Sequence, residues 1–342
     1  MQQISRKVVI LGTGGTIAGT AANSADHTGY TAAQIGVAQL VEGIVGLPEA
    51  LQGCALEHEQ VAQIDSKDMD FDTMARLAQR CGYFLAQSEV SAVVITHGTD
   101  TLEETAWFLQ CTVPAQLLAT KPIVLTCAMR PATSSESDGP RNVCDAVRVA
   151  LDGQSSGVLC VCAGDVHTAL QVQKVHSHAL NAFSSGDAGP RAQIQAAQVH
   201  WRLGKASSSI SNWPVSQWNI AGEAINNVVN NLLEIDLWPR VELLQNHAQA
   251  SGHIVHALLA SSVDPHSPLK GIVVAGTGNG TLSADLQSAL LAAHSRGVRV
   301  LRASRCAWGG VSATAHDVLP CTALSAVKAR VQMVLELVQL RA

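Results

Sequence analysis

Short, uninterrupted apolar runs alternate with amphipathic segments along the first half of the chain. The apolar runs, which end in small or polar residues, are Val8–Leu11, Ala92–Thr96, Pro122–Cys127 and Gly157–Cys162. Segments in which apolar residues recur three or four positions apart lie at Phe71–Gln87, Leu102–Leu109 and Arg141–Leu151. The first pattern is typical of buried strands and the second of helices. Apolar strands separated by helices predict parallel βαβ units with both sheet faces covered.

A second stretch of alternation lies toward the C-terminus. It comprises Arg240–Leu244, His253–Leu259, the strand Gly271–Ala275, the helix Ala284–Arg296, the strand Val298–Ala303 and the helix Leu324–Leu340. From Ser184 to Trp218 the pattern fades into Ser, Gly, Gln and Ala, with tryptophans that we expect to pack on the surface. We therefore expect an α/β fold in two domains. The larger N-terminal parallel-sheet domain spans 1–195 and the smaller C-terminal α/β domain spans 234–342. A linker at 196–233 joins them.

Composition and charge narrow the class of partner. The chain has 342 residues, of which 47% are hydrophobic and 14% charged, so it is able to bury two sizeable cores. The net charge is −5 with no run of Lys or Arg, which argues against nucleic acid or an anionic membrane surface as a partner. No apolar stretch reaches the roughly 20 residues that cross a bilayer.

The cysteines and histidines do not predict a metal site. The nine cysteines are spread along the chain without a CxxC pair, as expected of small buried hydrophobes in a reducing compartment. Cys160 and Cys162 share one strand face, and His176 and His178 are taken as a chance pair. Because Val8–Leu11 is too short for the core of a secretory leader, we expect a cytoplasmic protein, or a periplasmic one if a leader has been removed.

The residues that suggest chemistry follow the predicted strands. Four strand ends are rich in Gly, Thr, Asp and Asn: Gly12–Gly19, His97–Thr101, Ala128–Pro131 and Gly276–Gly280. In open α/β sheets, ligands bind where strands end at the carboxyl edge. Packing alone is a poor explanation for four such ends, and we expect a functional site there.

The first of these turns fails the nucleotide-binding patterns. A G-x-G-x-x-G fingerprint would need glycine where Ile17 stands, and no G-K-[ST] follows. What remains is a tight turn, Thr13–Thr16, that presents a hydroxyl beside glycine amides able to approach a ligand closely. Taken alone, it is as well explained as an ordinary strand-to-helix turn.

The second turn places hydroxyls and carboxylates together. In Thr99–Glu104 the acidic residues lie at the start of a predicted helix. There they cap free backbone N–H groups and interact favourably with the helix dipole, which stabilises the helix by about 1 kcal/mol. Alternatively, the Thr99 hydroxyl and the Asp100 carboxylate act through an ammonium or a water to activate a nucleophile, which a hydroxyl needs at neutral pH. These residues alone leave both readings open.

The two turns together resemble a known family. Thr13–Gly19 (TGGTIAG) and Thr96–Thr105 (THGTDTLEET) resemble the two signatures of bacterial L-asparaginases. The resemblance continues, in the family's order, through AMRP at 128–131, DGP at 138–140, GTGNG at 276–280 and KARV at 328–331. It spans nearly the whole chain and is strongest to the tetrameric, high-affinity branch. It implies an enzyme that hydrolyses L-asparagine without cofactor or metal.

The resemblance also implies a role for each matching residue. Thr16 resembles the nucleophile that forms an acyl-enzyme with the side-chain amide carbon, and Tyr30 resembles the lid tyrosine bonded to it. Thr99, Asp100 and Lys174 resemble a second set that activates a nucleophile or the hydrolytic water. Small, polar residues with two glycines in 18–30 are what a hinged lid requires.

Further residues are implied around the substrate. Ser66 and Asp100 resemble the groups that fix the α-carboxylate and α-amino group, while the Thr99 amide and the Ala128 carbonyl resemble those around the scissile amide. Asn279 resembles a residue lent to a neighbouring subunit. We therefore expect a homo-oligomer, a tetramer built as a dimer of dimers.

Some residues depart from the family pattern. Lys67 stands where relatives often carry a glutamine residue. From its charge near the α-carboxylate pocket we expect free glutamine to be a poorer substrate than asparagine. Residues 306–320 are shorter than their usual counterpart and show no clear equivalent of a cross-subunit glutamate, for which Asp317 is a weak candidate. The last helix ends early, at Leu340.

Two other functions remain as alternatives. An ammonia-releasing subunit of a tRNA-dependent amidotransferase shares this core but carries an extra N-terminal domain, whereas strand one is expected here at Val8; the net charge also does not suit tRNA. A non-enzymatic amino-acid binding protein of two α/β domains would need neither Thr16 nor Lys174.

Overall fold

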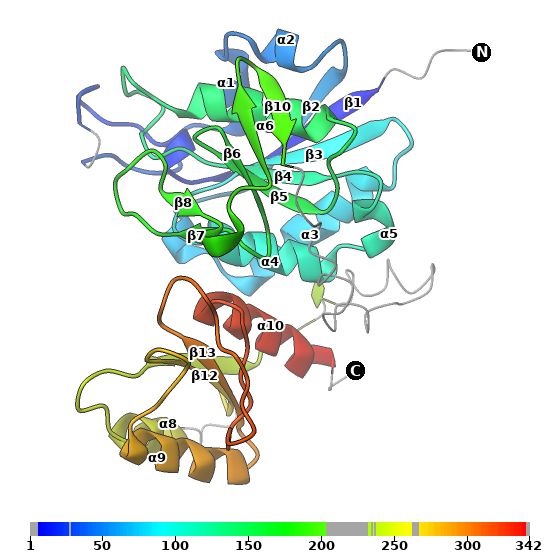
Figure 1. The fold of residues 1–342 in the computed structure, drawn as a ribbon. Coiled ribbons are helices and arrows are strands. Elements are labelled where there is room, and N and C mark those ends of the chain that lie inside the picture. The colour runs from blue at the N-terminus through cyan, green and yellow to red at the C-terminus, as the bar shows by residue number, and fades with distance from the viewer. Residues whose placement is uncertain are drawn as a thin grey trace. The chain divides into compact units, whose positions relative to one another are not determined.

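The chain folds into two compact units, residues 1–234 and 235–342 (Figure 1). A computed structural model describes residues 6–26, 29–202, 232–233, 235, 237–261 and 267–339. Within these ranges, no helix combines the length and the apolar character needed to cross a membrane.

The first unit is built on one eight-stranded sheet with the order β10-β9-β6-β5-β4-β3-β1-β2. Its strands are β1 (Lys7–Gly14), β2 (Ala55–Ile64), β3 (Val90–Thr96), β4 (Ile123–Thr126), β5 (Val158–Cys162), β6 (Asp165–Thr168), β9 (Ala192–Gln195) and β10 (Gln198–Trp201). Strands β1 to β5 are parallel, and the remaining three join antiparallel. A separate two-stranded ribbon pairs β7 (Gln173–Lys174) with β8 (Phe183–Ser184).

Helices cover both faces of this sheet (Figure 1). One face carries α1 (Val37–Glu42), α2 (Leu47–Ala50) and α6 (Gly139–Leu151), and the other carries α3 (Phe71–Leu85), α4 (Leu102–Thr112) and α5 (Ala115–Leu118). Alternate residues of the buried strands, such as Val8 and Ile10, pack into the core under α1, α2 and α6. Helix α3 begins where the Asp70 carboxylate accepts the Thr73 N–H at 2.7 Å, an N-cap that satisfies a free amide of the first turn.

The second unit is a smaller α/β layer structure. Its parallel strands are ordered β11 (Arg240–Gln245), β12 (Leu269–Gly276) and β13 (Arg299–Ser304). Helices α8 (His253–Ser261) and α9 (Ala284–Ser295) lie on one side and α10 (Ala326–Gln339) on the other (Figure 1). The core between the sheet, α8 and α9 includes Ile272, Val274 and Leu290. The predicted α/β class with a larger and a smaller domain is confirmed.

The first residues of the segment expected as a linker, 196–233, include a strand of the sheet. Residues 198–201 form β10 and pair with β9, because alternate residues of this short polar strand reach the edge of the sheet. Trp201 packs on the surface as expected, donating to Asp152 at 2.9 Å. Trp213, Trp218 and most of the expected linker lie outside the described residues.

Candidate active site

The site lies where the strand order of the first unit reverses. Strand β1 pairs with β2 on one side and with β3 on the other. The chain leaves β1 toward β2 and leaves β3 toward β4, so these two connections run in opposite directions. At such a switch point the loops beyond the carboxyl ends diverge and leave room for a ligand. Thr16 follows β1, and Thr99 and Asp100 follow β3, so the two turns singled out by the sequence meet there.

The two turns touch through glycines. A Cβ atom placed on Gly15 would lie 2.2 Å from the Gly98 Cα and 2.4 Å from its nitrogen, so the backbones are in direct contact. Gly15 has φ +80°, a conformation that costs other residues energy. Below this contact the Thr13 hydroxyl donates to the Thr96 carbonyl at 3.0 Å and ties the two strand ends together. The glycines of the first turn are therefore needed to bring the two hydroxyl-bearing turns together.

Thr16 begins a short 3₁₀ helix, Thr16–Ala18, and is almost buried. Its Oγ1 shares a hydrogen bond of 2.7 Å with the Tyr30 hydroxyl. Thr20 and Thr31 join the two ends of the loop that leads to Tyr30, through two backbone hydrogen bonds of 2.9 Å. A Cβ on Gly19 would lie 3.0 Å from the Tyr30 ring, so glycine gives the ring room. The structure thus brings Tyr30 into hydrogen-bond contact with Thr16, while His27 and Thr28 are outside the described residues.

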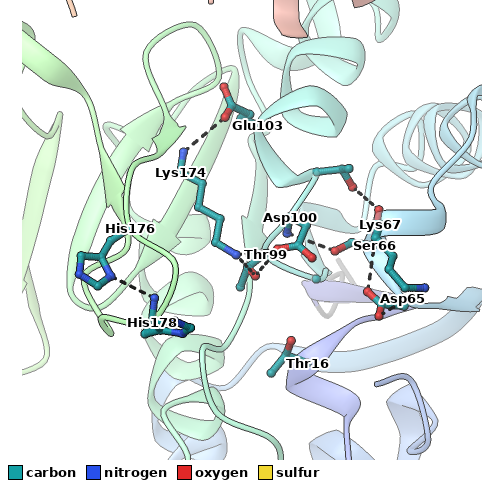
Figure 2. Close-up of polar contacts among 12 residues, drawn as sticks. Thr16, Asp65, Ser66, Lys67, Thr99, Asp100, Glu103, Lys174, His176 and His178 are labelled. Atoms are coloured by element: carbon teal, nitrogen blue, oxygen red, sulfur yellow. Dashed lines mark hydrogen bonds and ion pairs between the residues drawn. The ribbon is translucent and has the colours of Figure 1, made fainter. Parts of the chain in front are cut away.

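Thr99, Asp100 and Lys174 form one polar cluster (Figure 2). The Lys174 ammonium donates to the Thr99 Oγ1 at 2.7 Å and to the Asp100 Oδ1 at 2.6 Å. The Thr99 hydroxyl also faces the same carboxylate at 3.4 Å. The Lys174 side chain is 18% exposed, whereas that of Asp100 is 53% exposed and reaches open space. Figure 2 shows Thr16 on the neighbouring turn, below this cluster.

Lys174 reaches the cluster from a distant part of the chain. It ends β7, which is held to β8 by the pairing of Lys174 with Phe183. Its backbone N–H donates to the Glu103 carboxylate, in the first turn of α4, at 3.3 Å. Helix α4 therefore anchors the strand that carries the lysine.

Ser66 and Lys67 lie in a 3₁₀ helix, Ser66–Asp68, beside this cluster. The Ser66 Oγ accepts the Asp100 N–H at 3.2 Å, and the Ser66 carbonyl accepts the Thr101 hydroxyl at 2.7 Å. The Lys67 ammonium is hydrogen-bonded to Asp68 and lies 3.7 Å from Asp65. The hydrogen bond to Asp68 raises the pKa of Lys67 above its ordinary value. Lys67 is therefore charged, and two carboxylates offset its charge.

Ala128 is buried just beyond β4, in a turn organised by a carboxylate. Asp138 accepts the backbone N–H groups of Met129 and Arg130 at 3.0 Å. It also accepts the Asn142 side-chain amide at 3.1 Å, which in turn donates to the Cys127 carbonyl at 2.9 Å. This bonding fixes the backbone on both sides of Ala128. The sequence pointed to this DGP segment without indicating that Asp138 braces the turn.

His97 is a site residue to which the sequence analysis gave no role. It is completely buried, with Nδ1 2.7 Å from the Gly98 carbonyl and Nε2 3.0 Å from the Thr105 hydroxyl. Burial lowers the pKa of His97 from 6.5 to about 4, so its ring is neutral at physiological pH. A histidine directly after a strand that ends in the signature turn was the available signal.

Asn279 and Asp317 belong to the second unit, and each is bonded within it. The Asn279 side chain donates to the Ser312 carbonyl at 2.9 Å and accepts the Ser312 N–H at 2.8 Å, yet the residue stays exposed. Asp317 pairs with Arg302 at 2.7 Å, and its bonds to Thr314, together with Arg302, lower the pKa of the Asp317 carboxyl. Asp317 is thus engaged by its own unit.

The remaining candidates have structural explanations. The His176 ring nitrogen accepts the N–H groups of His178 at 3.0 Å and Ala179 at 2.9 Å, which closes a turn. The described part of the chain contains no group of three or more potential metal ligands. All nine cysteines are free and seven are buried, which fits their role as small hydrophobes.

Comparisons with known proteins place relatives along nearly the whole chain. The family description "Asparaginase, N-terminal" matches residues 7–206, and "Glutaminase/Asparaginase C-terminal domain" matches residues 240–340. "L-asparaginase 2" of Escherichia coli (strain K12) is 34% identical over 97% of this chain and 89% of its own length. "Glutaminase-asparaginase" of Pseudomonas fluorescens biotype A is 33% identical over 89% of this chain and 76% of its own length. A crystal structure described as a probable cytoplasmic L-asparaginase from Campylobacter jejuni superposes with a TM-score of 0.80 at 32% identity, covering 97% of this chain and 95% of that one.

The glycine contact between the two turns predicts a large cost for a single methyl group. Gly15→Ala should lower the free energy of unfolding by roughly 2–4 kcal/mol, because it adds an overlap with Gly98 to an unfavourable φ. The matched control is Gly82→Ala in α3, where a Cβ meets nothing within 4 Å and should stabilise by about 0.5–1 kcal/mol. Chemical denaturation measures both, and equal effects would contradict a tight contact at Gly15.

Proposed function

The chain belongs to the asparaginase family and is an amidohydrolase of L-asparagine, and we propose that Thr16 is the nucleophile that begins the reaction. The observation that carries this proposal is the hydrogen bond of 2.7 Å between the Thr16 and Tyr30 hydroxyls at the strand switch point. A threonine hydroxyl attacks an amide only when a neighbouring group withdraws its proton. Tyr30 is the group in contact with it, beside a second turn that carries an ammonium and a carboxylate.

The reaction proceeds in two halves. In the first, the Thr16 oxygen adds to the side-chain amide carbon of asparagine while its proton leaves through Tyr30, and the amide nitrogen departs with that proton as ammonia. In the second, a water adds to the resulting ester, aspartate is released, and the Thr16 hydroxyl is restored. Thr99, Asp100 and Lys174 are the groups placed to move protons in these steps, because they are joined by hydrogen bonds of 2.6–2.7 Å.

The substrate's three polar ends each find a partner in this arrangement. Asp100 is half exposed beside Ser66, which suits recognition of the α-amino group and the α-carboxylate. The Thr99 N–H and the Ala128 carbonyl serve the scissile amide, the first by stabilising the negative charge that develops on its oxygen. Every role in this scheme is filled by a group of the chain itself, and we propose that no cofactor or metal takes part.

The compartment and assembly are part of the proposal. The free, mostly buried cysteines support a reducing, cytoplasmic location, with a periplasmic one after loss of a leader as the alternative. We propose a homotetramer built as a dimer of dimers, in which Asn279 completes a neighbour's site. Its exposure and its two bonds to Ser312 support this, because they present a fixed side chain on the surface.

Replacing the nucleophile tests the mechanism directly. Thr16→Val should leave folding intact and reduce ammonia release from asparagine by roughly 10³-fold or more, because no hydroxyl remains to form the ester. Thr16→Ser is the matched control and should retain measurable turnover. Release is followed in a coupled ammonia assay, with thermal unfolding measured on the same samples. If Thr16→Val keeps more than a few per cent of wild-type turnover, the nucleophile is reassigned to Thr99.

Glutamine should be the poorer substrate. One extra methylene costs roughly 10–200-fold in discrimination. The charged Lys67 directly follows Ser66, which is proposed to bind the α-carboxylate of the substrate. We expect kcat/KM for glutamine to be at least about tenfold below that for asparagine. Lys67→Gln should narrow the gap. A wild type that hydrolyses both amides equally contradicts this preference, and an unchanged ratio in Lys67→Gln removes the role of Lys67.

Activity should depend on assembly. Because Asn279 is proposed to serve a neighbouring site, a protomer separated by dilution should release no ammonia from asparagine. Light scattering on the assayed sample gives the mass at each concentration. Full activity in a species with the mass of one chain would contradict the shared site.

A further inference from the structure

We propose that His97 is a positioning residue that orients the Gly98–Thr99 peptide so that the Thr99 N–H faces the amide under attack. This inference rests on the proposed function, in which that N–H stabilises the developing oxyanion. His97 does not touch the substrate in this scheme. It acts through the peptide bond that follows it.

The hydrogen bonds of His97 determine which of its nitrogens carries the proton. The Gly98 carbonyl, 2.7 Å from Nδ1, is able only to accept, so Nδ1 must donate. In a neutral ring Nε2 is then an acceptor, and the Thr105 hydroxyl, 3.0 Å away, donates to it. Burial keeps the ring neutral by lowering the pKa of His97 to about 4. One tautomer satisfies both partners.

The geometry of the peptide unit transmits this constraint to Thr99. The Gly98 carbonyl and the Thr99 N–H belong to the same planar, trans peptide and point in opposite directions. A ring that holds the carbonyl on its own side therefore directs the N–H away from α4. Glycine at 98 would otherwise allow this peptide to rotate more freely than any other residue would.

The ring itself is held by rigid surroundings. His97 directly follows β3, and its backbone N–H donates to the Thr126 carbonyl at 2.9 Å. Thr105 is fully buried in α4, where its own N–H donates to the Thr101 carbonyl at 3.0 Å. The imidazole is thus fixed between a strand and a helix, and its Nδ1 holds the Gly98 carbonyl.

A donor that acts on the oxyanion strengthens in the transition state, so its misorientation lowers kcat more than it raises KM. Complete loss of one such donor costs roughly 10²–10³ in kcat. With the donor present but no longer held, we expect a loss of about tenfold or more in kcat and a change in KM below about twofold. A role in packing alone would alter the amount of folded enzyme and leave kcat per active site unchanged.

Two variants of nearly equal size separate these roles. His97→Leu removes the donor to the Gly98 carbonyl, whereas His97→Asn keeps an amide N–H near the position of Nδ1. Both are assayed for ammonia release from asparagine, with active-site concentration determined separately. We expect kcat of His97→Leu to fall about tenfold or more and that of His97→Asn to stay within about threefold of wild type. Equal kcat values for the two variants would overturn the proposal.

A second pair keeps the test decisive if His97→Leu does not fold. Thr105→Val removes the hydroxyl that holds Nε2. Thr112→Val, on the same helix, removes an equally buried hydroxyl that only donates to the Phe108 carbonyl at 2.8 Å. Thermal unfolding should shift similarly in both, while kcat should fall about threefold or more in Thr105→Val alone. Thr105→Ser should restore it. Equal kcat in Thr105→Val and Thr112→Val overturns the inference.

The outcomes distinguish this inference from the function beneath it. Suppose that the wild type is active, that Thr16→Val is inactive, and that His97→Leu and His97→Asn have equal kcat. Thr16 then remains the nucleophile, and the positioning role of His97 is rejected. A wild type that releases no ammonia from asparagine rejects both.

Discussion

The direct contact between Gly15 and Gly98 is the constraint on which the candidate site depends. A parallel sheet brings β1 and β3 side by side, but side chains would normally keep the turns beyond them apart. Here a Cβ on either glycine would overlap its surroundings, with the Gly98 Cα 2.2 Å from a Cβ on Gly15 and the Ser66 Oγ 2.3 Å from a Cβ on Gly98. The absence of both side chains lets one strand end present Thr16 and the next present Thr99 to a shared space. The cost is a backbone with little intrinsic stiffness, which other residues must hold.

The first turn of α4 supplies much of that stiffness. Thr101 binds the Ser66 carbonyl, Glu103 binds the Lys174 N–H, and Thr105 binds His97, so one helical turn holds three segments that are distant in sequence. The sequence offered a helix cap as one explanation for the acidic and hydroxyl residues of this turn. In the structure Thr101 makes no cap bond, whereas Glu103 and Glu104 lie in the first turn as that explanation requires, and Thr101 and Glu103 also bond neighbouring segments. A helix start is well suited to this because its position is fixed by the core beneath it.

The apolar strands and long helices could be predicted because their hydrophobic patterns are strong. From the sequence alone, the rule that ligands bind at the carboxyl ends of parallel strands placed Thr16 and Thr99 at the same edge of the sheet. Strand β2 escaped prediction because it lies at the edge of the sheet and its side chains are half exposed, which leaves no apolar run. The position of Lys174 depended on the family resemblance. Its strand is two residues long, and its bond to Asp100 spans 74 positions. No local pattern encodes such a contact. The same holds for the bond between His97 and Thr105, because its meaning depends on the burial of the His97 ring and on which ring nitrogen carries the proton.

The surroundings of the two threonines support the different roles proposed for them. The Thr99 Oγ1 accepts a hydrogen bond from the Lys174 ammonium, which occupies one lone pair and lowers its nucleophilicity. The Thr16 Oγ1 is instead hydrogen-bonded to the Tyr30 hydroxyl and not to an ammonium. Attack is therefore better served by Thr16, and proton movement by Thr99 with its ammonium and carboxylate.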